Sequence, residues 1–320
     1  MVATLMWNPY ADPDSLRNHF IEGYYGKAAP YITKYIDNLT TRMLASKQPL
    51  WIYDSPVSHK HGMLSAEARA LYNSLFDKAE QAVADDATLL MRVRRSRLSL
   101  QFSQLEIART ENGSDPQQTE TLLDLFEQRV KEYNVPAINE RNNPPTDYCR
   151  LYRERYLRHD DGTNMARGCS VAYSTEPPKP YNKISSVALT DGLFGGATYV
   201  DSWVGWDGVD AAMTIDLGSL RRFHTVRADF LHQLGAWILL PKAVEYEVST
   251  DGTTFTPLGR HEIAEDRDAQ VKFLWVEHHE QQPVEARYIR LNVTGTKQCP
   301  HWHYGVGNSC WFFLDEIEVK

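Results

Sequence analysis

The residues best suited to bind a ligand lie in one short loop near the C-terminus, CPHWHYGVGNSC at residues 299–310. The loop carries His301, Trp302, His303 and Tyr304 in succession. An aromatic ring can stack on the apolar C–H face of a pyranose, and the sugar hydroxyls then need polar side chains within reach. Because the loop combines both kinds of side chain, it predicts a carbohydrate-binding surface.

Aromatic and polar residues elsewhere in the second half of the chain extend this prediction. The strands of a β-sandwich deliver their connecting loops to its two ends, so loops far apart in sequence can share one end. We expect Trp302 or Trp237 to stack on the sugar, and His303 and Asp201 to bind its hydroxyls. The whole predicted set is Tyr199, Asp201, Trp206, Trp237, His301, Trp302 and His303. The competing interpretation places tryptophans in the core, and for Trp203 it is the better one.

Other chemistries have weaker support. The pairs His301-x-His303 and His278-His279 offer two ligands to a transition metal, but neither has a recognisable third. The sequence has no Gly-x-Ser-x-Gly elbow of a serine hydrolase and no Gly-x-x-x-x-Gly-Lys phosphate loop.

The four cysteines leave two interpretations open. Cys299 and Cys310 bracket the aromatic loop, and a disulfide between them would stabilise the fold by about 3 kcal/mol in an oxidising compartment. A bridge between Cys149 and Cys169 is the other pairing. Four buried or free thiols are equally consistent with the sequence.

Length and composition bound the class of protein. The 320 residues suffice for two domains of ordinary size, and 42% apolar and 24% charged residues are typical of globular proteins. A net charge of −8 argues against a general nucleic-acid binder. No apolar run reaches about 18 residues, so we expect no membrane span. The first residues lack the charged and small-residue features of a signal peptide.

The first half of the chain is predicted to be helical up to about residue 158. Apolar residues recur at helical spacing after the Asp12-Pro13 opening, from Ala29 to Ala45, after Ser65, after Asp86 and from Leu122 to Tyr133. Short connections favour an antiparallel bundle. The arginines between residues 92 and 97 are expected to form a solvated helix face paired with acids.

From Cys169 onward the pattern changes to strands. Val244, Tyr246 and Val248 alternate with polar residues, and many such short strands with turns between them predict a β-sandwich or jelly roll. The fold class is therefore α then all-β, with a helical bundle at residues 1–158 and a β-sandwich at residues 159–320.

The segment LTDGLFGGATYVDSWVGWDGVDAAMTIDL, residues 189–217, combines an Asp-Gly turn, a glycine pair and two tryptophans before an alternating strand. Together with the C-terminal WFFLDEIEVK it resembles the discoidin domain, also called the coagulation factor V/VIII type C domain. The resemblance implies a galactose-binding-like sandwich whose loops face sugars or lipids and whose two ends meet at a structural calcium ion.

By this resemblance, Asp191, Thr198 and Glu316 are the expected Ca²⁺ ligands. Calcium takes six to eight oxygens, and an irregular glycine-rich loop such as Gly195-Gly196 can aim carbonyls inward. The alternative is an ordinary Asp turn beside a surface glutamate.

A second resemblance covers the N-terminus. Trp7-Asn8-Pro9, Tyr24-Tyr25-Gly26 and Ala28-Ala29-Pro30 resemble a bacterial family of unknown function related to glycoside hydrolases such as α-glucuronidases. In that family a (β/α)8 barrel precedes a helical bundle. The resemblance implies that residues 1–10 are the last strand of a barrel whose catalytic carboxylates lie outside this chain.

We therefore expect a non-catalytic C-terminal portion of a secreted, periplasmic or cell-surface glycan-processing protein, whose sandwich binds carbohydrate. The alternatives are a glycoside hydrolase with its own active site, and a structural or protein-interaction module. The sequence does not identify the sugar or the oligomeric state.

Overall fold

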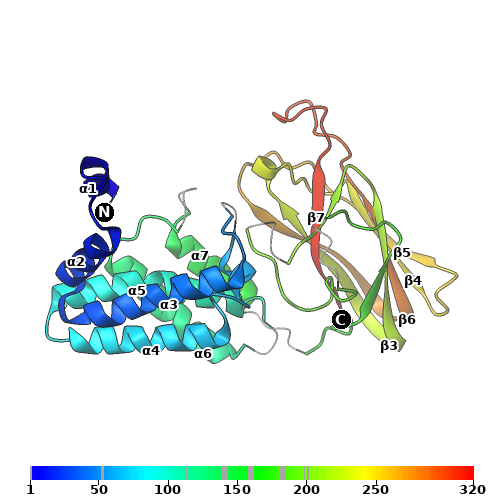
Figure 1. Ribbon diagram of the computed structural model, residues 1–320. Helices are drawn as coiled ribbons and strands as arrows, with labels where there is room; N and C mark the ends of the chain where they lie inside the picture. Colours follow the sequence, from blue (N-terminus) through cyan, green and yellow to red (C-terminus); the bar gives the residue numbers. More distant parts are fainter. Residues whose placement is uncertain are drawn as a thin grey trace. The chain divides into compact units, whose positions relative to one another are not determined.

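The computed structural model describes residues 2–51, 54–111, 114–138, 143–157, 162–179, 185–197, 199 and 202–320. It divides into two compact units, Met1–Arg158 and His159–Lys320. The first is helical and the second consists of β-strands (Figure 1). This confirms the predicted fold class of a helical region followed by an antiparallel β-structure. No described helix is long and apolar enough to cross a membrane.

Side-chain caps set the start of four helices of the helical unit. Asp12, Ser65, Asp86 and Asp115 each accept backbone N–H bonds in the first turn of the helix that follows, which satisfies donors that the helix itself cannot. The helices are α1 (Val2–Trp7), α2 (Pro13–Tyr25), α3 (Ala29–Ser46), α4 (Ala66–Ala82), α5 (Ala87–Ala108), α6 (Pro116–Glu132) and α7 (Pro145–Leu151). Short 3₁₀ helices at Gly26–Ala28 and Pro56–His59 and a π-helix at Tyr152–Tyr156 complete the unit.

Two of the four arginines between residues 92 and 97 of α5 pair with acids as predicted, whereas Arg92 donates to the Tyr24 carbonyl. Arg94 and Arg97 both bind Glu80 of α4, at 3.0 and 2.9 Å, and Arg129 of α6 approaches the same carboxylate at 3.3 Å. Burial raises the pKa of Glu80, but the bonds to Arg94 and Arg97 outweigh it, so the pKa lies below its ordinary value. The cluster links helices α4, α5 and α6.

The N-terminal segment differs from its prediction. Residues 2–7 form helix α1 where a barrel strand was expected, and none of the helix is buried. Trp7 and Tyr10 are 92% and 95% exposed. A strand needs neighbours to satisfy its backbone, whereas a helix bonds within itself, so the segment takes the helical form in this chain.

The β unit forms one continuous sheet that folds over itself into two layers (Figure 1). Its strands are β1 (Ser170–Tyr173), β2 (Val204–Asp207), β3 (Ala211–His232), β4 (Ala243–Ser249), β5 (Thr256–Glu262), β6 (Lys272–Thr294) and β7 (Trp311–Val319). The strand order is β2-β7-β3-β6-β4-β5, with β1 paired to β3, and all these pairs are antiparallel.

The two long strands belong to both layers. The first part of β3 pairs with β1 and with the end of β6, which in turn pairs with β4. The later part of β3 pairs with the start of β6 and with β7. Register shifts between Asp216 and Arg221 and between Phe223 and Thr225 mark the bend, and such irregularities sharpen strand curvature. The result is a sandwich whose apolar core is enclosed by both layers.

Candidate functional site

Trp237 has an unusual backbone conformation at one turn of the β unit. It follows the short 3₁₀ helix Leu234–Ala236 and adopts a left-handed φ of 62°, which bulky residues rarely do. Two backbone bonds hold it there: Trp237 N donates to Leu234 O at 2.9 Å, and its carbonyl accepts from Trp311 N at 2.9 Å. The turn is thereby tied to the start of β7. Backbone strain of this kind is concentrated at functional sites.

Tyr304 completes an exposed aromatic surface with Trp237. The Trp237 indole N–H donates to the Tyr304 hydroxyl at 2.7 Å, and that hydroxyl donates to the Gly235 carbonyl at 3.0 Å. The two ring centres are 6.0 Å apart at 70°. Tyr304 is 70% exposed and Trp237 is half-buried. We call Trp237, His301, Trp302 and Tyr304 the aromatic ledge.

The buried His303 ring packs against Tyr304 of the ledge. Its Nδ1 accepts the Gly305 N–H at 3.1 Å, so its Nε2 carries the proton and donates to the Leu234 carbonyl at 3.2 Å. The ring is 4% exposed and stacks on Tyr304 with centres 4.5 Å apart. Because both nitrogens are used and the ring is covered, the structure corrects the prediction that His303 binds sugar hydroxyls. It positions Tyr304.

Trp302 borders a pair of charged side chains. The Arg267 guanidinium lies over its ring at 5.2 Å from the centroid, an arrangement that favours a cation through the ring's electron-rich face. Arg267 also donates to Glu265 at 2.7 Å. The Trp302 indole, and next Arg267, hold the pKa of Glu265 below its ordinary value. A carboxylate in its ionised form therefore stands beside the ledge.

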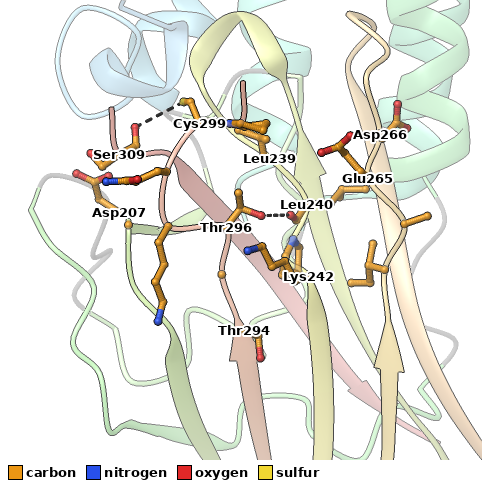
Figure 2. Close-up of a pocket in the computed structure, with 18 residues that line it drawn as sticks. Asp207, Leu239, Leu240, Lys242, Glu265, Asp266, Thr294, Thr296, Cys299 and Ser309 are labelled. Carbon is orange, nitrogen blue, oxygen red and sulfur yellow. Dashed lines mark hydrogen bonds between the residues drawn. The ribbon is translucent and has the colours of Figure 1, made fainter. Parts of the chain in front are cut away.

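A groove lies next to the ledge, since the loop that carries most of the ledge residues starts from residues that line the groove. The cavity has a volume of about 1070 Å³, and its wall includes Cys299 and Pro300, which immediately precede His301. Figure 2 shows Asp207 and Ser309 on one side and Glu265 and Asp266 on the other, with Lys242 and Thr296 between them. The polar groups that line it can donate and accept hydrogen bonds, as an uncharged polar ligand requires.

The remaining predicted sugar contacts are distributed differently. The structure corrects Trp206: its ring is fully buried, stacks on Phe312 with centres 5.2 Å apart, and its N–H donates to the Thr175 carbonyl at 2.9 Å. Tyr199 is half-buried and packs near Phe313, in the apolar cluster around Trp203. Asp201 lies outside the described residues. Trp203 is a core residue, as the competing interpretation required.

The sequence did not point to the charged side of this surface. Glu265, Asp266 and Arg267 lie in an irregular segment between β5 and β6, and Lys242 precedes β4. No local motif marks these residues, because the path of the loop brings them to the groove. The only signal was the acidic and basic run EDRD at residues 265–268, which by itself suggests nothing more than a solvated turn.

The predicted calcium ligands lie at a second place in the β unit. Both Glu316 carboxylate oxygens accept the Gly192 N–H, at 3.0 and 3.1 Å, and Asp191 accepts the Leu193 N–H at 2.9 Å. Asp315, also fully buried, accepts the Gly195 N–H. Burial, and next the charges of Asp315 and Asp191, raise the pKa of Glu316 well above its ordinary value.

The negative charge of these carboxylates suits a cation, but they supply only part of the ligands that calcium needs. A cation beside them would relieve the repulsion that raises the pKa of Glu316. The described residues hold no group of three or more His, Cys, Asp or Glu side chains arranged to bind a metal, although calcium also takes carbonyl oxygens. Thr198, the third predicted ligand, lies outside the described residues.

Two protein families match parts of the chain. Residues 168–309 match the F5/8 type C domain, and residues 1–37 match a domain of unknown function, DUF4838. The first match confirms the discoidin resemblance, and the second falls on the segment that resembles a family of unknown function. Among curated proteins, none matches the sequence.

Several solved structures are similar to about half of the chain. One is CBM32-1 from a family 31 glycoside hydrolase of Clostridium perfringens, 15% identical, covering 50% of this chain and 99% of that one with a TM-score of 0.33. Another is CpGH89CBM32-5 from Clostridium perfringens, in complex with GalNAc-β-1,3-galactose: 18% identical, covering 47% and 94%, TM-score 0.30. A third is chitosan-binding module 1 from a chitosanase/glucanase of Paenibacillus sp. IK-5: 17% identical, covering 49% and 98%, TM-score 0.31.

Proposed function

We propose that the F5/8 type C domain at residues 168–309 binds carbohydrate on the aromatic ledge and in the adjoining groove. The observation that carries the proposal is the exposed Tyr304 ring, held in place by Trp237 and His303. A large aromatic ring left 70% exposed to water gains nothing in folding from that exposure. Its fixed position means that a ligand can cover it with little loss of side-chain entropy.

The groove would supply the polar contacts that a sugar needs. A ring stacked on Tyr304 or Trp302 directs its hydroxyls outward from its edge, and Glu265 stands beside Trp302 in its ionised form. Charge-assisted hydrogen bonds from sugar hydroxyls to such a carboxylate are stronger than neutral ones. The combination favours an uncharged or amino sugar over an acidic one at this edge of the ledge.

The test is a titration of the full chain with ligands found on a glycan array. Tyr304→Ala should lose about 1–3 kcal/mol of binding free energy, since it removes one large stacked ring. Tyr10→Ala is the matched control, because Tyr10 is 95% exposed in the helical unit. If Tyr304→Ala and Trp302→Ala both fold and bind as the parent does, the ledge is not the binding surface.

The wider role that we propose is attachment. A non-catalytic sandwich of this kind would hold a secreted, periplasmic or cell-surface glycan-processing protein near its polysaccharide, which raises effective concentration without new chemistry. The catalytic alternative makes a distinct prediction: the full chain would hydrolyse aryl glycosides, and Glu265→Gln in the groove would abolish the reaction. If the parent hydrolyses aryl glycosides and Glu265→Gln does not, the groove is an active site and the binding proposal is wrong.

A structural calcium ion is the second part of the proposal. Asp191 and Glu316 would contribute carboxylate oxygens, and Ca²⁺ would neutralise the like charges around Glu316. An ion that binds only the native state stabilises it by mass action. Chelation should therefore lower the melting temperature of the parent but not of Asp191→Ala. Elemental analysis that finds no bound calcium in the untreated protein would count against the site.

A further inference from the structure

The two ends of the loop that carries most of the ledge bear cysteines. An antiparallel bridge pairs Gln298 with Ser309. Next to it, Cys299 N donates to Asn308 O at 2.8 Å, and Gly307 N donates to Cys299 O at 3.2 Å. These bonds form a narrow neck from which the loop projects. His301, Trp302 and Tyr304 all lie between the two cysteines.

Cys299 and Cys310 each follow one member of the Gln298–Ser309 bridge, so their side chains lie on the same face of this neck. Both are buried, in an apolar cluster with Leu234 and Leu239 against which Trp237 and Trp302 pack. Burial raises the pKa of both thiols; the neighbouring thiol lowers that of Cys299 and raises that of Cys310, which reaches about 12. Both are thiols in this structure.

The surroundings of the two sulfurs differ in access. Both are almost fully buried, Cys299 3% and Cys310 1% exposed, and Cys310 donates to the Thr296 carbonyl at 2.7 Å. Cys299 lines the groove, where its side chain is seen beside Ser309 (Figure 2). A small reactant in the groove therefore meets Cys299 first, and Cys310 stands behind it as the resolving thiol.

We propose that Cys299 and Cys310 form a reversible disulfide that closes the aromatic loop at its neck. The oxidant is a low-molecular-weight disulfide. The Cys299 thiolate attacks one of its sulfurs, which forms a mixed disulfide and releases one thiol. The Cys310 thiolate then attacks the Cys299 sulfur, the Cys299–Cys310 bond forms, and the second thiol leaves. The protein loses two protons and two electrons, and the oxidant becomes two thiols.

The bond would act on the loop without touching its exposed rings. It would join the neck covalently, whereas only backbone hydrogen bonds and apolar contacts join it in the reduced form. Opening of the neck would then no longer separate Tyr304 from Trp237. This inference concerns thiol chemistry and holds whether or not the ledge binds sugar.

The proposal can be tested by mass spectrometry, because tryptic digestion isolates the two cysteines on one peptide. Trypsin cuts after Lys297 and leaves both cysteines on one peptide, Gln298–Lys320. The full chain is incubated with oxidised glutathione, its remaining thiols are alkylated under denaturing conditions, and the digest is analysed by mass spectrometry. We expect this peptide to carry no alkyl group and to be lighter by two hydrogen atoms. Further cleavage after Trp302 or Tyr304 should leave two halves joined until a reductant is added.

Controls in the same sample decide the pairing. Cys149 and Cys169 should be alkylated, and Cys310→Ser should instead trap glutathione on Cys299. A Gln298–Lys320 peptide that carries two alkyl groups overturns the proposal, as does glutathione on both of its cysteines or a link from Cys299 to any cysteine other than Cys310. The parent protein alone yields each of these outcomes, so the test stands even if a variant fails to fold.

Discussion

Two tryptophans of the β unit show how the same side chain can serve the core or the surface. Trp206 lies in strand β2, fully buried, and its indole N–H donates to a backbone carbonyl. Trp237 lies on a strained turn, half-buried, and its indole N–H donates to the exposed Tyr304 hydroxyl. In both, the polar atom is satisfied. The two rings differ in their hydrogen-bond partner. Trp206 bonds to a backbone carbonyl in the core, whereas Trp237 bonds to the exposed Tyr304 side chain at the surface.

The largest effect should follow from removing the core ring. Trp206→Ala deletes a fully buried ring that stacks on Phe312, and we expect a loss of about 3–5 kcal/mol in the free energy of unfolding. Trp237→Ala should cost clearly less, because its ring is partly solvated and its removal also lets the turn relax. Urea denaturation of both variants checks this. Equal losses would break the comparison and make Trp237 a core residue.

The contrast also shows what sequence could and could not supply. Alternation of apolar residues and turn signals depends on local chain geometry, so the sandwich, the helical bundle and the ledge loop were all predictable. Trp206 and Trp237 were not distinguishable, because each has both a glycine and an apolar residue within two positions. What separates them is which strand or turn covers the ring, and that depends on contacts with Phe312 and Tyr304 far away in sequence.

The groove was unpredictable for a related reason. Glu265 and Arg267 reach Trp302 from an irregular segment more than thirty residues earlier, whose path no periodic pattern encodes. The N-terminal segment departs from its prediction for another reason. A strand was inferred from resemblance, but a strand depends on neighbours, and residues 2–7 form a helix instead.

A smaller effect should follow from crowding the ledge without removing any ring. A Cβ on Gly305 would lie 3.0 Å from Trp237 Cε2 and Cζ2 and 3.3 Å from His303 Nδ1. Gly305→Ala should therefore displace the Trp237 ring and cost about 1–3 kcal/mol, the usual range for overpacking. Gly235→Ala is the matched control, since its added Cβ meets no atom within 4 Å.

Tryptophan fluorescence and urea denaturation report the two parts of this effect. We expect Gly305→Ala to shift the emission and lower the midpoint, while Gly235→Ala changes neither. If the two variants behave alike, Gly305 does not position Trp237, and the ledge is looser than its hydrogen bonds indicate.

A pair of histidines between strands β5 and β6 extends the comparison to titratable rings. His261 Nε2 lies 3.1 Å from His278 Nδ1, and His278 Nε2 lies 3.0 Å from the Glu280 carboxylate. Glu280 therefore accepts the His278 proton, and His278 Nδ1 accepts from His261. The Tyr246 ring packs near both, with its hydroxyl bonded to the Val276 carbonyl. Here, as on the ledge, a half-buried ring depends on another side chain.

This pair should give the smallest of the three effects, as a dependence of stability on pH. Burial, and next the charge of His278, lower the pKa of His261 below its ordinary value of 6.5. As the pH falls through 6.5, the unfolded state is protonated at this histidine before the folded state. The contribution of His261 to the stability is therefore complete above pH 6.5 and is lost as the pH falls to the lower pKa of the folded state.

His261→Phe should show a weaker loss of its urea midpoint between neutral and acidic pH than the parent, whereas His61→Phe, in the helical unit, should follow the parent. If both variants show the same pH dependence as the parent, protonation of the His261–His278 pair does not affect the stability of the fold. The side-chain hydrogen bond of this pair would then contribute less than the one between Trp237 and Tyr304.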